Sequence, residues 1–198
     1  MSNPELIRAA IANKSGAVMN ELKGGAEVNF QDEDNKTALW YAASHGNTDL
    51  CKQLISKGAN VNIETHEGAP LHVACLHGHF DTVKFLVSSK ANVNLHGDNG
   101  KTPLHKAIQD NRLDIVQYLV ENGADINAKT TNEVQAIHFA SAEGRSDIVT
   151  YLLDKGASVN SQNGNLKTPL HVAAEKGHIH LIKTLLMKNA DTKAKNVF

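Results

Sequence analysis

The sequence places four potential metal ligands within ten consecutive positions. His72, Cys75, His77 and His79 all lie in the stretch PLHVACLHGH, residues 70–79. Imidazole nitrogens and thiolates are common zinc ligands, but they must converge to about 2.0–2.3 Å from one ion. On a helix, His72 and His77 would be separated by about 140° around the axis. Because the spacing also matches none of the usual zinc patterns, we predict no metal site here.

A second stretch resembles part of a phosphate-binding loop. Residues 100–102 read Gly-Lys-Thr, the end of the pattern G-x-x-x-x-G-K-[ST]. The first glycine of that pattern would fall at position 95, which is Leu95. A turn followed by a helix cap is therefore the favoured interpretation. The chain also lacks a Gly-x-Ser-x-Gly or His-Glu-x-x-His motif and a dinucleotide fingerprint. We predict no catalytic residue, no cofactor and no enzymatic activity.

The composition is that of a globular protein with no strong overall charge. Hydrophobic residues make up 41% of the 198 residues, and the formal net charge is −1. This charge gives no overall field that would draw the chain to nucleic acid or to anionic lipid. The two cysteines, Cys51 and Cys75, do not indicate a disulfide framework. We predict no nucleic-acid partner, no membrane insertion, a monomeric state for the chain alone, and a cytoplasmic location, with the nucleus as an alternative.

Two markers recur along the chain in one register. The first is the helix-start tetrapeptide Thr-Pro-Leu-His or a variant of it, at 37–40, 69–72, 102–105, 135–138 and 168–171, with steps of 32, 33, 33 and 33 residues. The second is Gly, Lys or Asn followed by Ala, at 25–26, 58–59, 90–91, 123–124, 156–157 and 189–190. A fixed period of this length indicates a repeat architecture.

Each period can be divided into local structures. Thr-Pro predicts a helix start, because the Thr hydroxyl caps a backbone N–H and Pro suits the first helical position. Glycines such as Gly46 and Gly144 should end this helix after about two turns by adopting a left-handed backbone. Apolar residues at helical spacing, as in 115–120 and 148–153, predict a second helix. A polar, extended stretch then leads to the next helix start.

These residues resemble ankyrin repeats, most completely in the stretch TPLHVAAEKGH at 168–178. The resemblance implies an all-α solenoid of about six helix-turn-helix repeats with β-hairpin-like loops, forming a single domain over 1–198. The repeats would be 1–33, 34–66, 67–98, 99–131, 132–164 and 165–198, with the first and last as end caps. The chain ends in what looks like the approach to another repeat, so we expect it to be the N-terminal part of a longer protein.

Several positions depart from the repeat pattern. Ala69 and Gln135 replace the capping Thr, which predicts a loss of about 1 kcal/mol at each helix start. Lys90 replaces a helix-ending Gly, and we expect a strained left-handed backbone there. The loop before Leu71 is one residue shorter than its equivalents, so its tip should be tighter. Trp40 replaces the motif His, and we expect it to pack mainly against the first repeat.

The resemblance also implies a role in binding other proteins. In this family the first helices line a concave groove, and the groove and the loop tips contact the partner. The positions expected to face the groove are Tyr41, Ser44, His45, Val73, Leu76, His77, Lys106, Gln109, Asp110, Phe139, Glu143, Val172, Glu175 and Lys176. Acidic tips at 32–34 and 64–67 favour a partner with a basic segment. The alternative is that these side chains form an ordinary surface or pack internally.

A modification site is a further hypothesis. Ankyrin proteins in animals can be substrates of an asparaginyl hydroxylase that acts on the Val-Asn exit of a repeat. The matching positions here are Asn29, Asn62, Asn94 and Asn160, with Ile126-Asn127 close to the pattern. The preferred interpretation is structural, because Asn side chains commonly bond backbone groups in turns.

Overall fold

The computed structural model describes residues 4–197, which contain twelve α-helices and no β-strand. The chain divides into two compact units, which we call the N-terminal unit (to Asp98) and the C-terminal unit (from Asn99). The helices of the N-terminal unit are α1 (Pro4–Ile11), α2 (Ser15–Lys23), α3 (Ala38–Ser44), α4 (Thr48–Ser56), α5 (Pro70–Leu76) and α6 (Phe80–Ser88). Those of the C-terminal unit are α7 (Pro103–Gln109), α8 (Leu113–Glu121), α9 (Ala136–Ala142), α10 (Ser146–Asp154), α11 (Pro169–Glu175) and α12 (Ile179–Met187).

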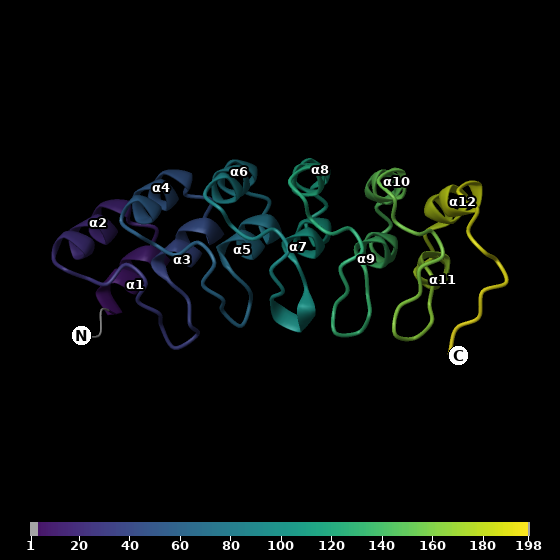
Figure 1. The fold of residues 1–198 in the computed structure, drawn as a ribbon, viewed down its shortest axis with the longest axis horizontal. Coiled ribbons are helices and arrows are strands. Elements are labelled where there is room, and N and C mark those ends of the chain that lie inside the picture. Colours follow the sequence, from purple (N-terminus) through teal and green to yellow (C-terminus); the bar gives the residue numbers. More distant parts are fainter. Residues whose placement is uncertain (1–3, 198) are drawn as a thin grey trace. The chain divides into compact units, whose positions relative to one another are not determined.

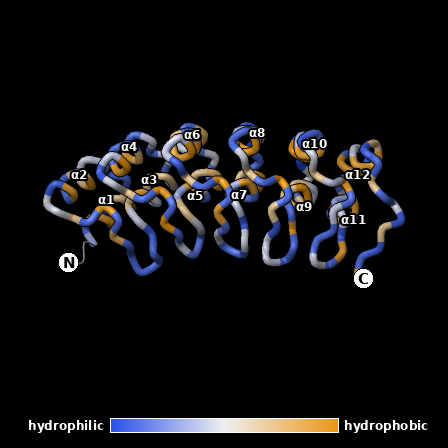
Figure 2. Tube along the Cα trace, viewed as in Figure 1, coloured by the Kyte–Doolittle hydropathy of each residue, from blue (hydrophilic) through white to orange (hydrophobic). Residues whose placement is uncertain are grey.

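Each unit is built from antiparallel helix pairs in two layers (Figure 1). In the N-terminal unit the first helices α1, α3 and α5 form one layer, and α2, α4 and α6 form the other. The C-terminal unit repeats this arrangement, with α7 packed on α9 and α9 on α11. The loops between pairs extend from the first-helix layer and are mostly hydrophilic (Figure 2). The predicted all-α repeat fold is confirmed.

The helix starts follow the predicted capping chemistry. Thr37 has an extended backbone, and its hydroxyl accepts the backbone N–H of Trp40 at 3.2 Å. Thr168 accepts the N–H of His171 in the same way at 3.4 Å. Pro103 and Pro169 occupy the first helical position, where no intrahelical bond needs their missing N–H.

The first helices end where the sequence predicts. Gly46 and Gly144 both have φ of 68°, in the left-handed region that favours glycine. Asn111, at the equivalent position of the fourth repeat, has φ of 56°. Lys90 has φ of 72°, so the predicted left-handed backbone at this non-glycine residue is confirmed.

The core lies between the two helix layers of each unit. On α8 the side chains of Ile115, Val116 and Leu119 are fully buried, as the helical spacing predicts. Small residues of the first helices, such as Ala43 and Cys75, are also fully buried. Ala174 lies at the equivalent position of α11 but is exposed. Within residues 4–197 no first helix follows α11 to cover it.

The loops are hairpin-like without becoming strands. Three tips have a backbone bond that spans five residues, in addition to one that spans four: Asp32 to Lys36 at 3.0 Å, Thr130 to Val134 at 3.0 Å, and Asn163 to Lys167 at 3.1 Å. The tip before α5 is instead closed over four residues, from the N–H of Gly68 to the carbonyl of Thr65 at 3.1 Å. The predicted tighter tip is confirmed.

The helix starts without Thr retain half of the capping arrangement. The Nδ1 atom of His72 accepts the backbone N–H of Ala69 at 3.1 Å, and His138 accepts that of Gln135 at 3.3 Å. In the Thr-containing repeats the hydroxyl adds a further contact, as between Thr102 Oγ1 and His105 Nδ1 at 3.0 Å. The motif histidine therefore caps every such helix start, and only the hydroxyl contribution is missing at Ala69.

We expect Ala69→Thr to raise the free energy of unfolding by about 0.5–1 kcal/mol, because the new hydroxyl can cap α5. The backbone at Ala69 is already extended, with φ of −72° and ψ of 170°. Gln135→Thr is the matched comparison and should gain less, since it removes the bond from Gln135 Nε2 to the carbonyl of Asn127. Urea unfolding of the two variants measures the difference. Equal gains, or no gain for Ala69→Thr, would contradict this account.

Candidate protein-interaction surface

The histidines and the cysteine of residues 70–79 are distributed over different structural roles. His72 uses Nδ1 to cap α5, and its Nε2–H donates to the carbonyl of Leu95 at 2.9 Å. His79 donates from Nε2 to the carbonyl of Ser44 at 2.9 Å. Cys75 is fully buried, which raises the pKa of its thiol, and His77 is exposed. Across the described part of the chain, no group of three or more His, Cys, Asp or Glu side chains could hold a metal ion.

The asparagines at the repeat exits connect neighbouring repeats. Asn29 donates from Nδ2 to the carbonyl of Gly58 at 3.1 Å, and its Oδ1 accepts the N–H of Asn60 at 2.8 Å. Asn62 repeats both bonds with Lys90 and Asn92, at 3.2 and 2.8 Å. These side chains bond backbone groups as expected, but the groups belong to the next repeat. Hydroxylation of these asparagines stays a prediction.

Tyr41 is held in a fixed position on the N-terminal unit. Its hydroxyl donates to Asp32 Oδ2 at 2.7 Å, and its ring meets Trp40 edge-on, with centroids 5.3 Å apart. Burial, the hydrogen bond to Asp32 and the nearby carboxylates all raise the pKa of Tyr41 above its usual range. Asp32 also accepts the N–H groups of Asp34 and Lys36, so it orders the loop tip and the Tyr41 ring together.

Lys36 completes this cluster from the same loop. Its Nζ lies 4.4 Å from the centre of the Trp40 ring and 2.6 Å from Glu67 Oε1. The side chain of Lys36 is only 13% exposed, so the ammonium group is committed to these neighbours. The charge of Glu67 is thus partly compensated, whereas Asp34 lies farther from Lys36 Nζ, at 3.9 Å.

Trp40 is positioned differently from the prediction. Its indole Nε1–H donates to the carbonyl of Gly68 at 3.1 Å, in the loop that follows rather than in the first repeat. The motif histidine makes the equivalent contact in the fifth repeat, where His138 Nε2–H donates to the carbonyl of Lys167, just before the next helix start, at 3.1 Å. Trp40 therefore replaces one of the two hydrogen bonds of the motif histidine, with an indole N–H donating to the following loop in place of the imidazole N–H.

The remaining predicted positions of the N-terminal unit differ in exposure. Ser44 and Leu76 are half-buried, and His45 and His77 are exposed. Val73 was expected to face a partner but is only 4% exposed. Val73 is a short side chain that packs into the interior beside the fully buried Ala74, so it offers little contact area. Its assignment to the contact surface is wrong.

In the C-terminal unit, Phe139 is the aromatic side chain among the predicted positions. It is half-buried; its ring meets His105 at 5.1 Å, with Lys101 Nζ at 5.6 Å from its centre. Lys106 was expected to face the groove, but it is only 7% exposed and does not belong to an accessible surface.

The other predicted residues of this unit remain accessible. Val172 is half-buried, and the exposed positions are Gln109, Asp110, Glu143, Glu175 and Lys176. Glu175 pairs with Lys167 at 2.7 Å, which lowers the pKa of its carboxyl group.

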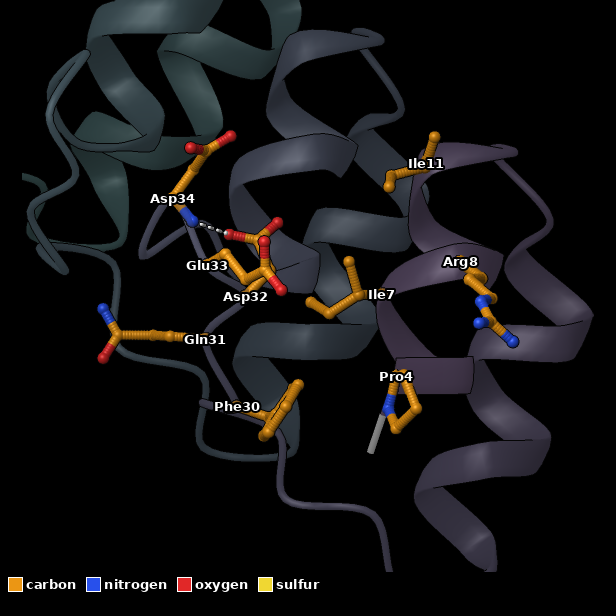
Figure 3. A pocket seen from close by; sticks show the side chains of 9 residues that line it. All are labelled: Pro4, Ile7, Arg8, Ile11, Phe30, Gln31, Asp32, Glu33 and Asp34. Atoms are coloured by element: carbon orange, nitrogen blue, oxygen red, sulfur yellow. Dashed lines mark hydrogen bonds between the residues drawn. The ribbon is translucent and has the colours of Figure 1, made fainter. Parts of the chain in front are cut away.

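An open pocket lies at the start of the N-terminal unit, between α1 and the first loop (Figure 3). Its volume is about 600 Å³, within the range of ligand-binding pockets. The lining residues are Pro4, Ile7, Arg8, Ile11, Phe30, Gln31, Asp32, Glu33 and Asp34. Ile7 points from α1 toward the loop, whereas Arg8 points away from it (Figure 3). The pocket thus has apolar side chains from the helix and carboxylates from the loop tip.

Of the residues that line this pocket, only the acidic tip stands out in the sequence. Phe30 follows the exit asparagine, where the other repeats have Ile63, Leu95, Ala128 and Ser161. The large aromatic side chain at that position was the feature of the sequence that could have indicated the pocket. Lys36 was also missed, although Lys precedes the capping Thr again at positions 101 and 167.

No helix among residues 4–197 combines the length and the apolar character needed to cross a membrane.

Comparison with known proteins gives a consistent result along the chain. A family profile described as "Ankyrin repeats (3 copies)" matches residues 6–97, 69–130 and 128–196. A Caenorhabditis elegans protein named as a homologue of transient receptor potential cation channel subfamily A member 1 is 50% identical over 54 residues, which are 27% of this chain and 4% of that protein. An ankyrin repeat-containing protein of Schizosaccharomyces pombe is 34% identical over 73 residues, 36% of this chain and 35% of that protein.

A third relative, human Rabankyrin-5, is 38% identical over 66 residues, 33% of this chain and 6% of that protein. The matched segments therefore span about a third of the yeast relative and a few per cent of the two longer ones.

Proposed function

The chain belongs to the ankyrin repeat family, and from this premise we propose that it binds another protein through its first helices and loop tips. Ankyrin repeats are generally protein-interaction modules. The finer proposal concerns the groove formed by the first helices and the tips beside it. On the N-terminal unit a partner would contact Tyr41 and Leu76. On the C-terminal unit, taken by itself, the corresponding position is Phe139, and all three side chains are half-buried.

The observation that carries this proposal is the fixed position of Tyr41. The bond to Asp32 and the contact with Trp40 hold a large amphipathic side chain at the surface in one orientation. A side chain ordered before binding loses little conformational entropy when the complex forms. Tyrosines of this kind are also enriched among the residues that dominate binding energy.

The charge distribution supports a partner with a basic segment at the N-terminal unit. Glu33, Asp34 and Glu64 are exposed on its loop tips. Lys36 pairs with Glu67 and compensates Asp34 only in part, at 3.9 Å. In the C-terminal unit Glu133 pairs with Lys129, and Glu175 with Lys167. Exposed carboxylates steer a basic partner and favour its specific recognition.

We further propose that the chain is not an enzyme, acts in the cytoplasm or nucleus, and is monomeric when alone. The hydrogen bonds of the histidines support the first point, because His72, His79 and His138 are committed to backbone groups. Burial lowers the pKa of His138, which favours its neutral form.

Affinity capture with the purified chain tests the proposed surface. We expect the variant Tyr41→Ala/Leu76→Ala/Phe139→Ala to lose the proteins that the wild type retains. The matched control Phe85→Ala/Tyr118→Ala/Tyr151→Ala removes half-buried aromatic rings from the second helices α6, α8 and α10. It should retain the same proteins. Circular dichroism checks that both variants are folded, and identical sets of retained proteins for all three chains would refute the surface.

A further inference from the structure

The pocket between α1 and the first loop combines two recognition chemistries. Ile11 is 50% exposed, and with the half-buried Phe30 it provides apolar surface open to solvent. The more deeply placed Ile7 is only 5% exposed and forms part of the pocket wall. Partly exposed apolar side chains gathered in one hollow favour burial of an apolar group from a partner.

The carboxylates at the rim are not equivalent. Asp32 is used by the protein itself, because it accepts hydrogen bonds from Tyr41 and from two backbone N–H groups. Glu33 is exposed, and the side chain of Asp34 is 74% exposed. Glu33 and Asp34 are therefore the carboxylates that a ligand can reach.

The two cations near this pocket, Arg8 and Lys36, leave most of the negative charge of the rim uncompensated. Arg8 is paired with Glu5 on α1, and its side chain points away from the loop (Figure 3). Lys36 Nζ lies nearest to Glu67, at 2.6 Å, and to the Trp40 ring, and it is 3.9 Å from Asp34 Oδ2, so it compensates Asp34 only in part. The accessible face of the pocket therefore presents negative charge next to apolar surface, and it complements a positively charged ligand.

We propose that this pocket anchors a partner segment in which one large apolar side chain lies next to Lys or Arg. The apolar side chain contacts Ile7, Ile11 and Phe30, and the basic group pairs with Glu33 and Asp34. This inference rests on the proposed function and adds to it the location and the chemistry of the anchor.

Selection of a phage-displayed library of random 12-residue peptides on the folded chain tests the anchor. Enriched peptides should contain a large apolar residue adjacent to Lys or Arg. By fluorescence polarisation, Glu33→Gln/Asp34→Asn and Ile11→Ser should each weaken binding of an enriched peptide about tenfold. The effect of the carboxylate variant should decrease at high salt.

The matched controls are Glu121→Gln/Asp125→Asn and Ile179→Ser, which change exposed residues of the C-terminal unit. These controls should leave the affinity for the enriched peptide within about twofold of the wild type, a much smaller change than the tenfold loss expected for the pocket variants. Three outcomes would each overturn the pocket assignment: enriched peptides that lack basic residues, pocket variants that bind an enriched peptide as tightly as the wild type, or a selection that enriches no peptide. Binding lost only with Tyr41→Ala or Phe139→Ala would also overturn it while leaving the proposed function intact.

A second copy of the chain could also occupy the pocket, and the experiment must distinguish it from a partner segment. Sedimentation velocity over a range of concentrations detects self-association of the wild type. Self-association that Ile11→Ser abolishes would assign the pocket to a second copy and overturn the proposal.

Discussion

Replacement of Trp40 by alanine is expected to lower the free energy of unfolding by about 3–5 kcal/mol, the usual cost of removing a large buried aromatic side chain. Trp40 is only 5% exposed, and it combines three contacts: the edge-on Tyr41 ring, the Lys36 ammonium group, and the carbonyl of Gly68. Its loss should therefore loosen the first and second loop tips together. Urea unfolding followed by circular dichroism measures the change.

Two conservative variants separate the contributions of Trp40. Trp40→Phe keeps an aromatic ring but removes the indole N–H, leaving the carbonyl of Gly68 without this donor. The cost of the lost hydrogen bond should be about 1–2 kcal/mol. Trp40→His restores the residue used in the other repeats, and it should be less destabilising than Trp40→Ala because its imidazole can bond the backbone N–H of Thr37 and the Gly68 carbonyl.

The outcome that would contradict this interpretation is a small effect of Trp40→Ala, within about 1 kcal/mol of the wild type. It would mean that the indole packs loosely and that the loop contacts do not depend on it. An equal loss for alanine and histidine would show that the ring volume matters and the hydrogen bond to Gly68 does not. Repeat proteins can unfold in steps, so the transition is followed at more than one wavelength.

The regular part of the fold could be predicted from sequence because local chemistry determines it. Thr37 and Thr168 cap helices by a hydroxyl contact three residues away, and Gly46 accepts a left-handed backbone that other residues resist. These interactions depend on neighbours in sequence. The shorter tip at Thr65 was predictable for the same reason, since one missing residue changes the closing bond.

Side-chain exposure could not be predicted equally well, because it depends on segments distant in sequence. Val73 and Leu76 lie on one short helix, yet Val73 is buried and Leu76 is half-buried. Ala174 occupies the position of the buried Cys75, but no first helix covers it among the described residues. The position of a residue in the repeat therefore predicts its backbone conformation more reliably than the burial of its side chain.

The pocket also could not be predicted from the sequence, because it depends on segments distant in sequence. Its apolar wall comes from α1, where Ile7 and Ile11 are separated by one helical turn, and from Phe30 in the loop. The acidic tip was visible in the sequence, but nothing in the repeat pattern placed α1 beside it. Only the packing of the first two helix pairs brings the two chemistries together.

The last prediction concerns the contact between Gly46 and His79, which connects successive repeats. A Cβ atom on Gly46 would lie 2.5 Å from His79 Nδ1 and 2.7 Å from its Cγ atom. The ring cannot turn away freely, because its Nε2–H donates to the carbonyl of Ser44. Gly46→Ala should therefore combine backbone strain, about 1–2 kcal/mol for a left-handed residue, with loss of this hydrogen bond. We expect a total destabilisation of about 2–4 kcal/mol.

Gly177 provides the matched control for Gly46→Ala. It occupies the same turn of the last repeat with φ of 75°, and no heavy atom lies within 4 Å of its added Cβ. Gly177→Ala should show the backbone strain alone, whereas Gly144→Ala should behave like Gly46→Ala, because His178 lies 2.6 Å from the added atom.

The double variant Gly46→Ala/His79→Ala isolates the clash. Removing the imidazole leaves space for the methyl group, so the double variant should be destabilised by at least about 1 kcal/mol less than the sum of the two single variants. Urea unfolding of the wild type, the two single variants and the double variant gives this coupling free energy. Additive effects would show that Gly46 is needed only for its left-handed backbone, and that the His79 ring does not require a glycine beneath it. A coupling of the expected sign would instead establish His79 as part of the contact between repeats, which is a structural role for the histidine-rich stretch at 70–79.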